Sequence, residues 1–286
     1  MKHCLIMTAY KDAAQINRII GITPPEWGIY IHIDRKSALK AEDIDSRARV
    51  MKRYTIHWGA YAHLQAFLTL MEEARQSGAG YDYYHLVTGQ DYYASRPDRF
   101  DELIEPGNYI YMETYPYPRP NWWGDHYELV RIRSLAEYTD IRRPFGKMME
   151  LAYEWVQRIT RTMQPVPPYP MYCGSVYLSL PADVVDWCLH SDIARDMQQR
   201  LKHCKIGEEL YFQTVIMNSP FKERVVDSNL RFIIWNVARP PKFLVESDAS
   251  AIASSATLFC RKVDTGRSGS LPDAIEKEWN LANVKV

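Results

Sequence analysis

Residues 3–34, with the sequence HCLIMTAYKDAAQINRIIGITPPEWGIYIHID, contain the pattern that decides the fold. An apolar run from His3 to Ala9 predicts a buried strand, and the periodic run from Ala13 to Ile20 predicts a helix. A second apolar run from Gly28 to Ile33 predicts another strand, which Asp34 follows directly. Because strands that alternate with helices are typical of a mainly parallel sheet covered by helices, this stretch predicts an α/β fold.

The same alternation continues along the chain. Apolar residues recur at the spacing of one helical face at Leu64, Phe67, Leu68 and Met71. Further strands are predicted at residues 53–58, 83–88, 109–112, 172–180 and 231–235, and further helices at residues 146–163, from Pro181 onward, and at residues 208–217. The proline-rich run at residues 165–170 is interpreted as a connection inside one domain, so a single domain is expected over residues 1–286.

Charge and cysteine content narrow the class of protein. The 35 basic and 35 acidic residues balance, so no overall field attracts the chain to nucleic acid, and no nucleic-acid partner is expected. The five cysteines are scattered and lack metal-ligand spacing, which argues against a disulfide framework. Lys11 and Asp12 end the first apolar run far short of a signal peptide or membrane span. We therefore expect a reducing, cytoplasmic location.

Polar residues that directly follow predicted strands are the first candidates for a site. Ligands of open α/β sheets bind beyond the carboxyl ends of the strands, and this rule selects Asp34, Asp91 and Glu113. The alternative for Asp34 is a solvated turn. Asp91 could belong to a metal site of the Asp-x-Asp type, but that motif is absent there, and Asp43-Ile44-Asp45 lies in a charged, surface-like stretch. No metal site is predicted.

Two neighbouring acids, Glu208 and Glu209, open the predicted helix at residues 208–217. Acids in a first helical turn commonly interact with the helix dipole alone. Alternatively, one carboxylate faces the ligand crevice as a general base and takes the proton from an attacking hydroxyl. The residues themselves leave this choice open.

Seven strings follow one another in a distinctive order. They are IHIDRKS (31–37), WGA (58–60), YHLVTGQDY (84–92), GSVYLSL (174–180), GEELYFQT (207–214), NLR (229–231) with Trp235, and LFCRKVD (258–264). Together they resemble the core-2/I-branching β-1,6-N-acetylglucosaminyltransferase family, which also includes peptide O-xylosyltransferases. The resemblance implies one GT-A-like, Rossmann-like catalytic domain, a UDP-sugar donor, inversion at the anomeric carbon, and no divalent metal or other cofactor.

The resemblance also implies roles for individual residues. Glu209 takes the place of the catalytic base, although a shift of one residue would give that role to Glu208. Arg239 and Lys262 match the two cations that neutralise the diphosphate of the donor, as fixed positive charges can do without a metal. Asp34 matches the acid that recognises the nucleoside.

The acceptor is less closely defined. Glu113 and Trp123 align with contacts to the acceptor sugar. The Golgi members of the family have a membrane anchor, a stem and disulfides that this sequence lacks, so it resembles a stand-alone bacterial catalytic domain. We therefore expect a cytoplasmic enzyme of polysaccharide biosynthesis that extends a glycan or glycolipid precursor. A membrane-bound acceptor would bring peripheral membrane association with it.

Three other functions remain open at this stage. UDP-xylose could replace UDP-N-acetylglucosamine as the donor. The chain could bind nucleotide sugars or glycans without catalysis, although a binding protein would not need Glu209, Arg239 and Lys262 together. A metal-dependent hydrolase or nucleotidyltransferase that uses Asp34 and Asp91 would lose activity in the presence of a chelator.

Overall fold

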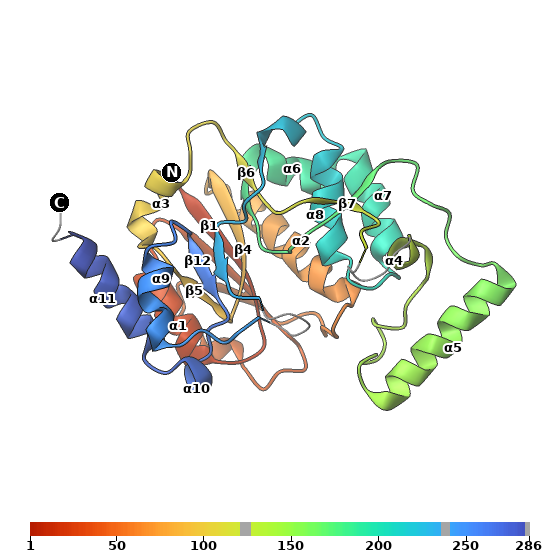
Figure 1. Ribbon diagram of the computed structural model, residues 1–286, viewed down its shortest axis with the longest axis horizontal. Coiled ribbons are helices and arrows are strands. Elements are labelled where there is room, and N and C mark those ends of the chain that lie inside the picture. Colours follow the sequence, from red (N-terminus) through yellow and green to blue (C-terminus); the bar gives the residue numbers. More distant parts are fainter. Residues whose placement is uncertain (121–126, 236–240, 284–286) are drawn as a thin grey trace.

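The computed structural model describes residues 1–120, 127–235 and 241–283 (Figure 1). Within these residues, the largest sheet has seven strands. In spatial order they are β10 (Val225–Val226), β6 (Ile110–Tyr111), β9 (Ser179–Pro181), β4 (Tyr83–Thr88), β1 (His3–Ala9), β2 (Gly28–Ile33) and β3 (Arg49–Met51). β9 runs antiparallel to β4 and β6, whereas the other neighbouring pairs are parallel. The predicted α/β class with a mainly parallel sheet is confirmed.

Helices cover both faces of this sheet. One face packs against α2 (Tyr61–Gln76), α6 (Ala182–His190), α7 (Asp192–Leu201) and α8 (Glu208–Met217). The other face packs against α1 (Ala13–Ile22), α9 (Ala249–Ala253) and α11 (Leu271–Asn283). In β1, Cys4 and Ile6 contribute to the first core, and Leu5 and Met7 contribute to the second. Burial on both faces explains why β1 is apolar throughout rather than alternating.

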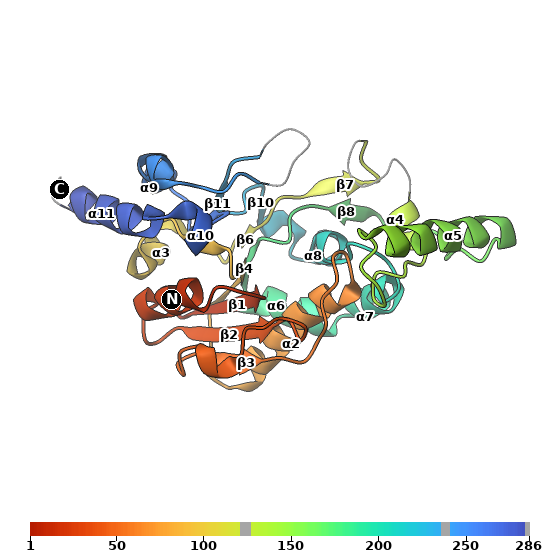
Figure 2. The same ribbon diagram turned by 90° about the horizontal axis from the view of Figure 1, so that it is seen from below.

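Two smaller sheets lie beside the large one (Figure 2). The first contains β11 (Arg231–Ile233), β12 (Phe259–Arg261) and β5 (Asp91–Tyr93), and the second pairs β7 (Tyr115–Tyr117) with β8 (Met171–Cys173). The remaining helices are α3 (Phe100–Leu103), α4 (Glu128–Arg131), α5 (Pro144–Thr160) and α10 (Thr265–Ser268). α5 lies at the opposite end of the molecule from α11 (Figure 1). No helix of the described ranges combines the length and the apolar character needed to cross a bilayer.

The buried guanidinium of Arg231 joins the first small sheet to the large sheet. Its Nη2 donates to the carbonyl oxygens of Leu86 in β4 (3.3 Å) and of Leu178 (3.2 Å). Burial lowers the pKa of Arg231 to about 9, and the nearby charge of Asp91 acts in the opposite direction. The position of β11 is therefore fixed by hydrogen bonds that a charged side chain makes inside the protein.

The strand predicted at residues 53–58 is wrong. These residues form a loop, and the strand that pairs with β2 is β3. The backbone amides of the loop find side-chain partners instead of a ladder, since Tyr54 N–H donates to His32 Nε2 (2.9 Å) and Ile56 N–H donates to Asp34 Oδ1 (3.2 Å). A short run of apolar and aromatic residues was therefore not sufficient evidence for a strand.

The single strand predicted at residues 172–180 is also wrong, because the chain forms β8 and β9 in two different sheets. Gly174 lies at the break. Its N–H donates to the carbonyl of Glu209 (2.9 Å), and a Cβ atom at this position would lie 2.1 Å from the carbonyl oxygen of Glu113. This close approach of three backbone segments requires a glycine and ends the pairing of β8.

The first prediction concerns the core under α2. Phe67 is fully buried there, so Phe67→Ala should leave a cavity and lower the free energy of unfolding by about 3–5 kcal/mol. Phe145→Ala is a matched control, since Phe145 is 67% exposed and its loss should cost little. Urea denaturation followed by circular dichroism measures both changes. Equal stability of the two variants would contradict the placement of α2.

Candidate active site

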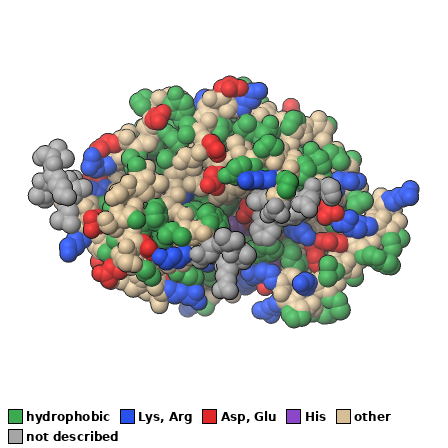
Figure 3. Space-filling view, in the orientation of Figure 1, with side chains coloured by type: hydrophobic (Ala, Val, Ile, Leu, Met, Phe, Trp, Pro, Cys, Tyr) green, Lys and Arg blue, Asp and Glu red, His purple; other side chains and the backbone are tan. Residues whose placement is uncertain are grey.

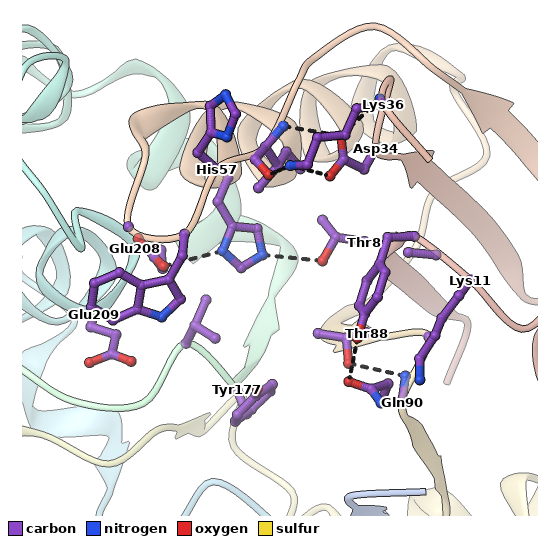
Figure 4. A pocket seen from close by; sticks show the side chains of 18 of the residues that line it. Thr8, Lys11, Asp34, Lys36, His57, Thr88, Gln90, Tyr177, Glu208 and Glu209 are labelled. Atoms are coloured by element: carbon purple, nitrogen blue, oxygen red, sulfur yellow. Dashed lines mark hydrogen bonds and ion pairs between the residues drawn. The ribbon is translucent and has the colours of Figure 1, made fainter. Parts of the chain in front are cut away.

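A cleft of ≈ 520 Å³ opens at the carboxyl ends of β1, β2 and β4 (Figure 4). Asp34 and Lys11 lie on one side of it, and Glu208 and Glu209 at the start of α8 lie on the other. The residues that line the cleft come from distant parts of the sequence, from Thr8 to Arg261. Of the three residues that the strand-end rule selected, Asp34 lines this cleft, whereas Asp91 and Glu113 are not part of its lining.

The carboxylate of Asp34 is held in a turn at the end of β2. Its Oδ1 accepts from the backbone N–H groups of Lys36 (3.1 Å) and Ile56 (3.2 Å), and its Oδ2 is 2.9 Å from Nζ of Lys36. Asp34 is buried, whereas Lys36 is about half exposed. The carboxylate is therefore fixed in direction, while its partner on Oδ2 is a flexible side chain that a ligand can displace.

Glu208 belongs to a chain of three polar side chains across the cleft (Figure 4). Its Oε1 is 3.2 Å from Nδ1 of His63, and Nε2 of His63 is 3.2 Å from Oγ1 of Thr8. Since an ionised carboxylate only accepts hydrogen bonds, the Nδ1–H of His63 donates to Glu208, and in the neutral imidazole Nε2 then accepts from Thr8. The buried Oε2 of Glu208 has no hydrogen-bond partner within the described residues.

Glu209 also lines the cleft and is half-buried. Two glycines hold the start of α8 in place, because Gly59 O accepts from Ile206 N–H (2.8 Å) and Gly174 N–H donates to Glu209 O (2.9 Å). Gly59 has a φ of +73°, which a side chain would strain. The structure therefore places both Glu208 and Glu209 at the cleft, where sequence analysis left the choice between them open.

A buried ion pair connects the cleft to the first small sheet. Nη1 of Arg261 in β12 is 3.0 Å from Oδ1 of Asp91 and also donates to Oγ1 of Thr88 (3.3 Å). The guanidinium lies over the ring of Tyr177, 4.1 Å from its centroid. Arg261 therefore presents a fixed positive charge at the cleft, and Asp91, which the strand-end rule had selected, is its partner.

Further cations gather beside Arg261. Lys262 follows it in the chain but is not part of the cleft lining, and Lys11 lines the cleft while it forms an ion pair with Asp264. Burial, followed by the charges of Arg261, Lys11 and Arg267, lowers the pKa of Lys262. Burial is the main cause of this shift, and the three neighbouring cations add to it; an anionic ligand placed among these cations would relieve their mutual repulsion.

One other predicted site residue, Glu113, lies outside the cleft. Glu113 is half-buried after β6 and does not line the cleft; burial, followed by the charge of Asp227, raises its pKa. Trp123 and Arg239 lie outside the described residues. In the described ranges, no group of three or more His, Cys, Asp and Glu side chains could hold a metal ion.

Sequence analysis missed several residues of the cleft. His63 lies on α2, and its spacing resembles that of any half-buried helical residue. Thr8 is the penultimate residue of β1, and Lys11 follows in a polar loop. None of them is part of a motif that we used. The strand-end rule could have indicated Thr8 and Thr88, since both are the polar residues nearest the carboxyl ends of their strands.

The comparisons with known proteins identify the family. The family model described as "Branch: Core-2/I-Branching enzyme" matches residues 23–253, which include Asp34, Glu208 and Glu209, whereas Arg261 and Lys262 follow the matched range. No curated protein matches the chain. Because the family match covers most of the chain and the α/β architecture agrees with it, the protein belongs to the Core-2/I-branching enzyme family and is a glycosyltransferase with a GT-A-like fold, acting on a nucleotide-sugar donor and a glycan acceptor.

Proposed function

We propose that this glycosyltransferase moves N-acetylglucosamine from UDP-N-acetylglucosamine to a sugar hydroxyl of a glycan or glycolipid precursor, with inversion and without a divalent metal. The observation that carries the proposal is the arrangement of one cleft, in which Asp34 lies opposite Glu209 and Arg261 supplies a fixed positive charge. In this proposal, Asp34 recognises the nucleoside of the donor, Glu209 takes the proton of the acceptor hydroxyl, and Arg261 stabilises the diphosphate.

In this mechanism, Glu209 is the general base. The acceptor hydroxyl gives its proton to the Glu209 carboxylate as the acceptor oxygen bonds to the anomeric carbon. The bond from that carbon to the phosphate oxygen breaks, and UDP leaves with the electron pair. A carboxylate suits this task because a sugar hydroxyl is a poor nucleophile at neutral pH.

The leaving diphosphate is proposed to be stabilised by Arg261 and Lys262, with Arg239 as a third cation. Positive charges fixed in a cleft stabilise charge that develops on phosphate oxygens, which is what a divalent metal does in other glycosyltransferases. The pairing of Asp91 with Arg261 supports the absence of a metal, because the acid that could have held one is 3.0 Å from a guanidinium, which it also fixes in position at the cleft.

Glu208 is proposed to orient the donor sugar. Its Oε1 is engaged by His63, and its Oε2 is buried without a partner within the described residues, so a turn of the carboxylate toward the cleft would let it accept a hydrogen bond from a sugar hydroxyl. Glu113 and Trp123 remain proposed contacts of the acceptor. UDP-xylose is the alternative donor, since nothing in the lining of the cleft distinguishes a hexosamine from a pentose.

The second prediction tests the function and the role of Asp34. Calorimetry with a set of UDP-sugars should show binding, with slow hydrolysis of the preferred donor, and Asp34→Ala should weaken UDP binding by about 1.5–3 kcal/mol. Asp45→Ala is a matched control, because Asp45 also accepts a backbone N–H in a turn (Arg47, 2.9 Å) but lies outside the cleft. Unchanged UDP affinity in Asp34→Ala would remove Asp34 from the site, and the absence of binding to any UDP-sugar would overturn the proposed function.

The third prediction separates the two neighbouring acids. Glu209→Gln keeps the shape of the side chain but cannot take a proton, so turnover should fall by about 10²–10⁴-fold while UDP affinity is retained. Glu208→Gln should have a smaller effect on turnover and a larger effect on KM for the donor. An inactive Glu208→Gln beside an active Glu209→Gln would assign the base to Glu208 instead.

The fourth prediction concerns the metal. Turnover should persist in excess EDTA, whereas Arg261→Ala and Lys262→Ala should each reduce UDP affinity and turnover. Because Arg261 is buried against Asp91, its loss could also destabilise the fold, so Arg261→Lys is the conservative comparison. Loss of activity in EDTA that manganese restores would show that a metal, rather than these cations, stabilises the leaving group.

A further inference from the structure

The helix α5 exposes an unusual apolar surface. We call Phe145, Met148, Met149, Trp155, Val156 and Ile159 the apolar stripe, since the helical period places them on one side of α5. Phe145, Met148, Trp155 and Ile159 are each 59–67% exposed. Single exposed apolar residues are normal, but a continuous stripe of large side chains on one helix marks an interaction surface.

The polar side of the same helix faces the protein. The buried residues of α5 are Gly146, Glu150 and Gln157. Glu150 Oε2 accepts from Leu135 N–H (2.7 Å), and Gln157 bonds to both the N–H (2.8 Å) and the carbonyl (2.7 Å) of Arg133. These polar contacts fix the orientation of α5, and they therefore keep the apolar stripe on the solvent-exposed side of the helix.

Basic residues accompany the apolar stripe. Residues 142–161 contain five basic side chains (Arg142, Arg143, Lys147, Arg158 and Arg161) and two acidic ones, in a chain whose charges balance as a whole. All five basic residues are exposed. Arg142 and Arg143 share Asp140 (3.1 and 3.9 Å), and Arg158 pairs with Glu128 (2.6 Å). The acidic Glu154 is engaged by Lys205 at 2.6 Å, so the segment keeps an excess of positive charge. Figure 3 shows basic and hydrophobic side chains together at the end of the molecule where Figure 1 places α5.

The apolar stripe and the basic residues beside it together indicate what kind of partner binds α5. Apolar and aromatic side chains on one side of a helix, with Lys and Arg beside them, are typical of helices that lie in the interface of an anionic membrane. A second copy of the chain fits less well, because a symmetric contact through the apolar stripe would bring two basic surfaces together. The cleft lies near the start of α5, because Arg142, two residues before Pro144, lines the cleft.

We propose that α5 docks the protein on an anionic lipid surface, with the apolar stripe at the boundary between headgroups and acyl chains. Docking through α5 keeps the cleft close to the membrane, where it can reach a sugar acceptor carried by a lipid. The docking step itself requires neither a donor nor catalysis, so it can be tested independently of the proposed function.

The fifth prediction is measured by cosedimentation with lipid vesicles. The protein should bind vesicles of phosphatidylcholine and phosphatidylglycerol, and bind much less to phosphatidylcholine alone or at high salt. Phe145→Glu and Trp155→Glu should each weaken binding at least about tenfold, because each removes one large side chain from the interface. Val245→Glu adds the same charge at an exposed apolar position near α9 and should bind like the unmodified protein.

Two controls make the result decisive. Urea midpoints and UDP affinity of the two α5 variants should equal those of the unmodified protein, since neither residue lines the cleft or belongs to the core. Sedimentation velocity reports self-association. Absence of vesicle binding overturns the proposal. If the protein instead forms a dimer that the same two substitutions dissociate, the apolar stripe is a contact between two copies of the chain, and the proposal is equally overturned.

Discussion

The buried carboxylate of Asp91 is the charge on which the arrangement of this protein depends. It forms an ion pair with Arg261 and also lies close enough to Arg231 to favour that residue's charged form. A charge inside a protein is tolerated only when it is paired, and this carboxylate pairs with Arg261 while its charge also acts on Arg231 of the neighbouring strand. The small sheet must therefore join the large sheet at the end of β4, and this junction puts Arg261 at the cleft.

The elements that could be predicted from the sequence are those whose own side chains are buried. β1, β2 and β4 are apolar runs with both faces covered, and α8 begins and ends where its sequence pattern does. The failures at residues 53–58 and 172–180 have another cause. There the backbone is held by groups distant in the sequence, such as His32, Asp34 and Glu209, and no local pattern records such partners.

The residues of the candidate site also fall into those that the sequence could indicate and those that it could not. Asp34 follows a strand and Glu209 opens a helix, so position along the chain and family resemblance together selected them, and both line one cleft. His63 and Thr8 could not be found in this way, because their significance comes only from the distances of 3.2 Å that connect them to each other and to Glu208. The apolar stripe of α5 was hidden for a related reason: periodicity predicts a helix with two faces, but it does not indicate which face meets the protein.

The pairing of β5 with β12 also has a consequence for the order of folding during synthesis. β5 comes soon after β4 in the chain, yet its antiparallel partner β12 is made about 170 residues later. Until residues 259–261 have emerged from the ribosome, Asp91 lacks the guanidinium of Arg261, and the proposed site for the diphosphate is incomplete. Under the proposed function, a nascent chain can therefore build most of the large sheet while it is still unable to hold the donor, so binding of UDP would report that β12 has been made.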